Sequence, residues 1–219
     1  MVPEKDELVE LFQRLDTTAV SDALDRLGIK GGCPGISARV PGTKAVGRAF
    51  TVRYRPCGVE KGTVGDFLDD VRPGQVVVLD NGGRTHATVW GDIMTVYARK
   101  RGIAGTVIDG VCRDMPRILE SRYPIFTRGH IPVTGKDRVE LDGLNIPVAV
   151  SEVLVRPDDI VLCDDTGVVV VPHDRAEEVL KAAVEIDETE QRILEMLDKG
   201  MSLREARKQA GYHKLQSRK

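Results

Sequence analysis

Aromatic residues, paired cysteines and long apolar runs are scarce in this chain, and each scarcity excludes a class of protein. Aromatic residues make up 4% of its 219 residues, which argues against the stacking platforms that bind single-stranded nucleic acid. The four cysteines include no CxxC pair and match no zinc spacing, so we expect free thiols and a cytoplasmic location. No apolar run approaches the roughly 20 residues that a membrane-spanning helix needs, and the acidic N-terminus does not resemble a signal peptide.

The chain also lacks an excess of charge of either sign. Its net charge of −2 provides no general basic surface, so we expect neither a nucleic-acid ligand nor a membrane partner. Hydrophobic residues make up 41% of the chain, which is enough for the core of one domain of this length. We predict a single α/β domain over residues 1–200, in which a sheet is layered with helices, and a basic C-terminal tail over residues 201–219.

Helical and strand patterns alternate along the chain. Apolar residues recur at helical spacing between Leu8 and Leu15. Thr17 or Thr18 is expected to cap the next helix, and Gly28 is expected to end it. We predict helices over residues 5–15, 17–27, 66–71, 93–101, 114–121 and 174–199, a loop over 29–42, and strands over 45–55, 75–80, 105–109, 125–127, 147–150, 160–163 and 168–171.

One segment echoes another. VRPGQVVVLDNGG at residues 71–83 resembles VRPDDIVLCDDTG at residues 155–167, and each reads as a turn, a buried strand and an acidic turn. This similarity has two interpretations. It is either a pseudo-repeat that places two functional turns on one sheet, or a recurrence of turn and strand patterns without functional meaning. We favour the second interpretation and expect a strand in each segment.

The most informative stretch is GDIMTVYARKRGIAGTVIDGVCRD, which runs from Gly91 to Asp114. Twenty residues separate Asp92 from Arg113, about the length of a helix and a strand that return the chain to the same edge of a sheet. Two carboxylates and a guanidinium then meet at one rim, where they can hold a divalent cation and an anionic oxo acid. Without further context, Arg113 and Asp114 can also form only a helix cap and a surface ion pair, and Asp92 can be an N-cap.

Together with DTTAVSDALDRLG at residues 16–28, VVVLDNGG at 76–83 and RPDDIVLCDDTGVVVVP at 156–172, this stretch resembles the RraA-like family, named after a regulator of ribonuclease E. The resemblance covers roughly residues 10–190. It implies a layered α/β domain that forms homotrimers or homohexamers with sites between subunits. It also implies a class II aldolase activity on 4-hydroxy-4-methyl-2-oxoglutarate or 4-carboxy-4-hydroxy-2-oxoadipate.

The resemblance assigns roles to individual residues. Asp114 matches the family's metal ligand, with Mg²⁺ or Mn²⁺ as cofactor, and Arg113 matches its substrate-binding arginine. The turn that borders the substrate matches Gly91, Asp92, Ile93 and Met94. The implied reaction is metal-assisted cleavage of a 4-hydroxy-2-oxo diacid to pyruvate and a second oxo acid, with Asp92 orienting a water that takes the proton; oxaloacetate decarboxylation fits the same site. The family also uses a glutamate from a neighbouring subunit, and the candidates here are Glu185, Glu188 and Glu190.

Two other functions compete with the aldolase. Some family members are protein regulators that bind ribonuclease E or RNA helicases, and the basic tail is a candidate contact for such a partner. A lyase for sugar acids or phosphorylated sugars on the same scaffold is the other alternative. The complete set of Asp92, Arg113 and Asp114 favours an enzyme.

Several residues near these motifs have two interpretations. In the segment 52–66, which departs from the family, Arg53, Arg55 and Lys61 either favour a larger or more acidic substrate or form a solvated edge. His86 either lines the site and moves protons or, as we favour, is structural. We expect His130 and His173 to lie in surface loops and Cys112 to be a small buried residue.

Overall fold

Two long strands, β2 (Ala45–Pro56) and β3 (Val76–Thr88), form the centre of an eight-stranded sheet in the computed structural model, which describes residues 6–60 and 62–212. The strand order is β1-β5-β4-β3-β2-β9-β10, and β6 pairs with the far half of β2. Strands β2 to β5 are mutually parallel, and β1, β6, β9 and β10 add antiparallel pairs. The remaining strands are β1 (Ser37–Ala38), β4 (Gly105–Cys112), β5 (Ile125–His130), β6 (Val139–Leu144), β9 (Ile160–Asp164), β10 (Gly167–Val171) and a separate hairpin of β7 (Val148–Val150) and β8 (Val153–Val155).

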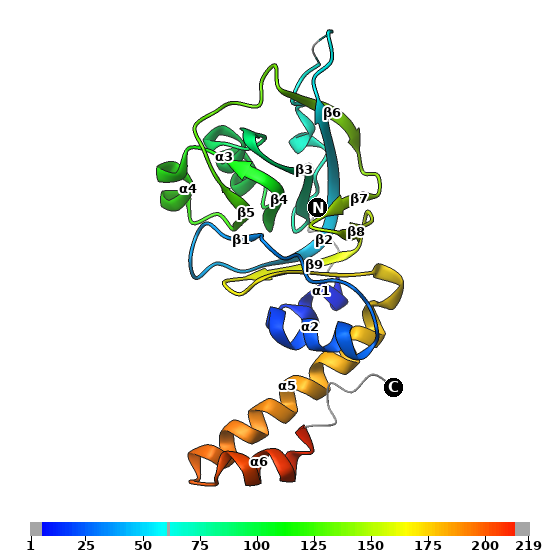
Figure 1. The fold of residues 1–219 in the computed structure, drawn as a ribbon, viewed down its shortest axis with the longest axis vertical. Helices are drawn as coiled ribbons and strands as arrows, with labels where there is room; N and C mark the ends of the chain where they lie inside the picture. The colour runs from blue at the N-terminus through cyan, green and yellow to red at the C-terminus, as the bar shows by residue number, and fades with distance from the viewer. Residues whose placement is uncertain (1–5, 61, 213–219) are drawn as a thin grey trace.

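The helices form two groups around the sheet, as Figure 1 shows. The connections between parallel strands carry η1 (Phe67–Asp69), α3 (Asp92–Lys100) and α4 (Met115–Ser121), which lie together beside β3, β4 and β5. The second group lies beneath β9 and consists of α1 (Glu7–Phe12), α2 (Thr17–Arg26) and α5 (Ala176–Asp198), preceded by η2 (His173–Arg175). This arrangement confirms the predicted layered α/β fold.

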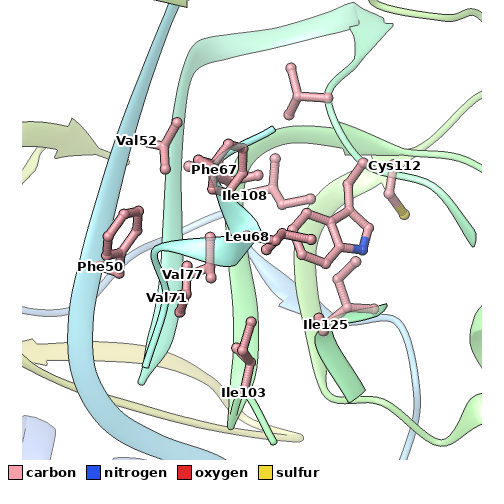
Figure 2. Packing of buried hydrophobic residues seen from close by; sticks show 14 of the residues in the cluster. Phe50, Val52, Phe67, Leu68, Val71, Val77, Ile103, Ile108, Cys112 and Ile125 are labelled. Carbon is pink, nitrogen blue, oxygen red and sulfur yellow. The ribbon is translucent and has the colours of Figure 1, made fainter. Parts of the chain in front are cut away.

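Each helical group covers its own apolar core. Between the parallel strands and the first group, Phe50 stacks on Phe67 with ring centroids 6.4 Å apart, and Ile108 and Ile125 extend the packing (Figure 2). A second core lies between the second helical group and strands β9 and β10. It includes Phe12, Val20, Leu24, Leu162 and Ile186. A third cluster fills the space between the sheet and the β7–β8 hairpin. The buried runs of the central strands therefore have apolar partners on both faces, as parallel strands require.

Several predicted boundaries were wrong. Asp16, and not Thr17 or Thr18, caps α2, because its carboxylate accepts a 2.7 Å hydrogen bond from the amide of Ala19. Strand β3 continues beyond the expected turn at Asn81, with a shift of register against β4 between Asp80 and Arg84. Strands β4 and β5 are each three residues longer than predicted, and β1, β6 and β8 were not predicted.

The echoing segments share a turn geometry. In both, the amide of the arginine before the proline donates to the side chain three residues later, over 2.9 Å from Arg72 to Gln75 and 2.7 Å from Arg156 to Asp159. The two strands that follow, β3 and β9, lie on either side of β2. Both strands were predicted, and the shared hydrogen bonds give a structural reason for the similar sequences.

The C-terminal helices extend from the body of the molecule. The first half of α5 packs on α1 and α2, whereas its far end extends away and α6 (Leu203–Ala210) folds back beside it (Figure 1). A capping box of Ser202 and Glu205 begins α6, and Ala206 is buried. Part of the predicted basic tail is therefore helical. Among residues 6–60 and 62–212, no helix combines the length and apolar character needed to cross a bilayer.

Candidate functional site

The turns that precede α3 and α4 meet at one edge of the sheet. The amide of Arg113 donates to the carbonyl of Trp90 over 3.1 Å, which joins the end of β4 to the turn before α3. The buried indole of Trp90 donates to the Thr95 hydroxyl over 2.8 Å, and that hydroxyl donates to the carbonyl of Gly91 over 2.8 Å. The turn that begins α3 is therefore anchored to the core by one hydroxyl group.

Asp114 directs its carboxylate toward this turn. Its backbone is left-handed, with φ 62° and ψ 39°, and its side chain makes no capping hydrogen bond to α4. Instead, Asp114 Oδ2 accepts a 3.2 Å hydrogen bond from the amide of Asp92, across 22 residues of sequence. The interpretation of Asp114 as a simple cap for its own helix is therefore wrong.

Asp92 is the first residue of α3, and Gly91 occupies the N-cap position. The Asp92 carboxylate accepts a 2.8 Å hydrogen bond from the adjacent amide of Ile93. The amide of Met94 has no partner among the described residues. Two of the first amides of α3 are thus satisfied by aspartates, and a third is left to donate to a ligand.

Arg113 completes the group. Its Nε lies 3.3 Å from Asp114 Oδ2, and the two side chains are 39% and 35% exposed. An ion pair this exposed contributes less than about 1 kcal/mol to stability, so structural support alone is a weak reason for the pairing. The guanidinium and both carboxylates lie at a rim that solvent and small molecules can reach.

Position 91 needs glycine because a side chain would not fit there, and not because of its backbone angles. Its φ of −149° is open to any residue. A Cβ at this position would lie 2.6 Å from Asp114 Oδ2 and 3.3 Å from Arg113 Nε. The absence of a side chain therefore allows the two turns to approach closely enough for the Asp92–Asp114 hydrogen bond.

A cleft of about 320 Å³ opens beside this group. Its two walls come from the start of α4 and the end of β5, and it is lined by Arg113, Asp114, Met115, Pro116, His130, Ile131 and Pro132. Of the predicted site residues, Arg113 and Asp114 line the cleft, while Gly91 and Asp92 support them. Ile93 is 80% exposed and Met94 packs against the core, so their side chains are not part of its lining.

His130 is a lining residue that sequence reasoning missed. It is exposed as expected, but it is the last residue of β5 and pairs with Cys112 of β4, so the predicted loop was wrong. The sequence offered little sign of this position, because the predicted strand ended at Thr127, three residues before His130. Cys112 is buried as expected, and burial raises the pKa of its thiol to about 11. His86 is exposed within β3, which does not support a structural role, and His173 begins η2 and contacts the buried Asp159.

The basic segment before η1 does not reach the cleft. Arg53 pairs with Asp142 over 2.6 Å, and Arg55 pairs with Glu140 over 2.9 Å, across the β2–β6 ladder. These pairs support the interpretation of a solvated edge for both arginines. Lys61 lies outside the described residues.

The three candidate glutamates differ in their surroundings. Glu185 pairs with Arg26 over 2.9 Å. Burial, and then Asp22, Asp16 and Asp187, raise the pKa of Glu190. Glu188 is exposed and its carboxylate has no partner among the described residues. None of the three lines the cleft of its own chain.

The donor set fits a weakly held hard cation. Across residues 6–60 and 62–212, no group of three or more His, Cys, Asp or Glu side chains is arranged to hold a metal. Magnesium, however, commonly uses one or two protein carboxylates and keeps several waters. Asp114 lies at the rim with Oδ1 free of protein partners among the described residues, and the Asp92 carboxylate belongs to the adjacent residue of the group.

A second hollow, of about 350 Å³, lies between the start of α2 and β10. Its lining consists of hydroxyl, glycine, proline, cysteine and aliphatic residues, without a charged side chain. The smaller cleft carries the arginine, aspartate and histidine, so it is the candidate site.

The chain is similar to several known proteins. The RraA-like family model, described as Aldolase/RraA, matches residues 17–170. Protein DlpA of Legionella pneumophila is 37% identical over 216 residues, which are 95% of this chain and 35% of DlpA, so the chain spans about a third of that relative. A protein of Halalkalibacterium halodurans named "Putative 4-hydroxy-4-methyl-2-oxoglutarate aldolase" is 30% identical over 177 residues, which are 81% of this chain and 82% of that one.

A solved structure shares the fold. RraAS2 of Streptomyces coelicolor, described as an unusual member of the RNase ES inhibitor RraA protein family, matches with a TM-score of 0.80 and 32% identity. The match covers 86% of this chain and 96% of that chain. Since the family model covers more than half of the sequence and includes both the Gly91–Asp92 turn and the Arg113–Asp114 pair, the chain belongs to the RraA-like family.

Proposed function

We propose that this chain is a divalent-metal-dependent aldolase that cleaves a 4-hydroxy-2-oxo diacid to pyruvate and a second oxo acid. The observation that carries the proposal is the meeting of Asp92, Arg113 and Asp114 at one rim, through contacts of 3.2 and 3.3 Å. The name of the Halalkalibacterium halodurans relative supports it. Decarboxylation of oxaloacetate suits the same site, because both reactions pass through the enolate of pyruvate.

Arg113 binds the anionic end of the substrate in this proposal. Its Nε faces Asp114, which leaves the two Nη atoms for a carboxylate or a keto oxygen. The amide of Met94 lies at the start of α3, where the helix dipole favours negative charge. An arginine fork and a helix N-terminus together suit a 2-oxo acid.

Asp114 would hold the cation, Mg²⁺ or Mn²⁺. When bound there, the cation supplies Lewis-acid stabilisation of the negative charge that develops on the 2-oxo group. The hydrogen bond from the Asp92 amide orients the Asp114 carboxylate before any ligand arrives, which reduces the reorganisation that binding requires.

Asp92 assists the transfer of the 4-hydroxyl proton in this proposal. A water held by its carboxylate takes the proton of the 4-hydroxyl group as the C3–C4 bond breaks. The hydroxyl carbon becomes the carbonyl of the second oxo acid, and the pyruvate enolate takes a proton at C3. The reaction is therefore balanced without an oxidant or reductant.

A neighbouring subunit completes the site in the homotrimer or homohexamer that we propose. Ile93, Val96 and Leu119 of α3 and α4 are 80%, 52% and 44% exposed beside the rim. Because α3 and α4 contact each other, these exposed apolar side chains on adjacent helices support a subunit interface there. Glu188 lies in the second half of α5 and its carboxylate has no partner within residues 6–60 and 62–212, so it is the best candidate for a glutamate donated to the next subunit.

A regulator that binds ribonuclease E or RNA helicases is the alternative, and the RraA description of the Streptomyces coelicolor structure is the observation that favours it. Exposed basic residues of α6, Arg204 and Lys208, provide a candidate contact. Such a regulator needs no rim of paired aspartates and arginine. The presence of that rim is the reason for preferring the enzyme.

The decisive test is release of pyruvate from a panel of 2-oxo acids, with and without Mg²⁺. We expect release from 4-hydroxy-2-oxo diacids and from oxaloacetate, and loss of activity in excess chelator that Mg²⁺ restores. Full activity in chelator would refute the proposed metal dependence. Absence of pyruvate release from every acid in the panel would refute the proposed aldolase activity.

A further inference from the structure

His130 faces the same side of the sheet as the start of α4. In a sheet, residues paired across neighbouring strands point to the same face. His130 pairs with Cys112, whose sulfur lies 3.8 Å from the sulfur of Met115 in the first turn of α4. The imidazole therefore leaves the end of β5 on the face where Met115 lies, in agreement with its place in the cleft lining.

The lining of the cleft contains two groups that can bind an anion. Arg113 belongs to the wall formed by the end of β4 and the start of α4, and His130 belongs to the wall formed by the end of β5. Apart from Asp114, the other lining residues are apolar or proline: Met115, Pro116, Ile131 and Pro132. An anion that entered this cleft away from Arg113 would find its hydrogen-bond donor in His130.

A diacid has two anionic ends and therefore needs two such groups. The 2-oxo acid end is accounted for by Arg113 and the Asp114 rim, which leaves the distal carboxylate directed along the cleft. We propose that His130 binds this distal carboxylate and thereby selects diacids over monoacids, an inference that rests on the proposed function. His130 is a specificity residue in this assignment and takes no part in bond cleavage.

A matched pair of ligands isolates the contact. 2-Oxoglutarate and 2-oxopentanoate have the same five-carbon chain and the same 2-oxo acid end, and they differ in the distal carboxylate. Their binding to the full chain is measured by calorimetry in Mg²⁺, for the wild type and for His130→Gln. We expect the substitution to weaken 2-oxoglutarate binding about tenfold, the equivalent of one charge-assisted hydrogen bond, and to leave 2-oxopentanoate binding unchanged.

The control is His173→Gln, which alters a half-exposed histidine outside the cleft. It should change the binding of neither acid. Equal weakening of both acids by His130→Gln, or no weakening of either, would overturn the role of His130. Wild-type protein that binds neither acid would overturn it as well.

Turnover separates this inference from the aldolase on which it rests. Suppose that His130→Gln selectively loses 2-oxoglutarate binding and that the protein releases no pyruvate from any substrate. The proposed diacid site would then stand, and the proposed aldolase activity would be refuted. In an active enzyme, the same variant should raise the KM for 4-hydroxy-2-oxoglutarate about tenfold and leave the KM for 4-hydroxy-2-oxopentanoate unchanged. If the enzyme is active and both KM values rise equally, the proposed aldolase activity stands and the proposed role of His130 is refuted.

Discussion

Substitution of Gly91 by alanine tests whether the two turns must touch. The backbone angles at this position, φ −149° and ψ −163°, are accessible to alanine, so the change introduces no backbone strain. The new methyl carbon would lie 2.6 Å from Asp114 Oδ2. An ordinary contact begins near 3.4 Å, so the carboxylate has to move by about 0.8 Å (3.4 minus 2.6).

The cost of this movement falls on activity more than on stability. Asp114 Oδ2 is the end of a partly exposed side chain that can rotate away, at the loss of its hydrogen bond with Asp92. That bond is worth about 1 kcal/mol, which lowers the Tm of a chain of this length by about 2–4 °C. A displacement near 1 Å of a group that holds reactants can cost about 100-fold in rate.

We therefore expect Gly91→Ala to lower kcat/KM for pyruvate release about 100-fold, and to raise the Mg²⁺ concentration needed for half-maximal activity. Pyruvate is measured by coupling to lactate dehydrogenase, and Tm by differential scanning fluorimetry. Gly32→Ala is the control, because a methyl group there meets nothing within 4 Å. Wild-type activity and Mg²⁺ dependence in Gly91→Ala would refute the reasoning, since the clash would then have no effect on the site.

Four further predictions concern the rim and its surroundings. Asp114→Asn should abolish Mg²⁺-dependent turnover without unfolding, since asparagine tolerates the left-handed backbone but loses the charge; retained activity would contradict the metal assignment. Arg113→Lys should raise KM and lower kcat, because lysine lacks the planar fork, while Asp92→Asn should lower mainly kcat; equal changes in KM alone would argue against these roles. Because the pKa of Glu190 is raised in the folded protein, its contribution to stability is present below the ordinary value of 4.5 and is lost as pH rises through the folded pKa, so Glu190→Gln should raise Tm by about 1–2 °C at pH 7 and not below pH 4.5. Light scattering should detect a trimer or hexamer that loses activity on dissociation, and a fully active monomer of 24.0 kDa would exclude the shared site.

Local patterns predicted most of the fold. The helices at 17–27, 93–101 and 174–199 were recognised because their apolar spacing and end signals are local properties of the chain. The strands that were missed are short or carry short patterns, as in β6, whose sequence VELDGL alternates apolar and polar residues over only four positions before Gly143. Its side chains acquire partners only when β2 lies beside it, where Glu140 meets Arg55.

The sequence by itself determined which residues are brought to the rim. The interval between Asp92 and Arg113 is the length of one helix and one strand, and a parallel connection of that kind returns the chain to the same edge of the sheet. Membership of the family follows from the same residues, since they lie within the segment that the family model matches.

Only the tertiary structure decided how these residues are arranged. The hydrogen bond from the Asp92 amide to Asp114 joins two turns, and the need for glycine at position 91 arises from that approach. The same holds for His130, which enters the cleft because β5 extends to pair with Cys112. Contacts between segments distant in the chain depend on how the strands are placed against one another, and that placement is determined by the packing of the whole core and not by any local pattern.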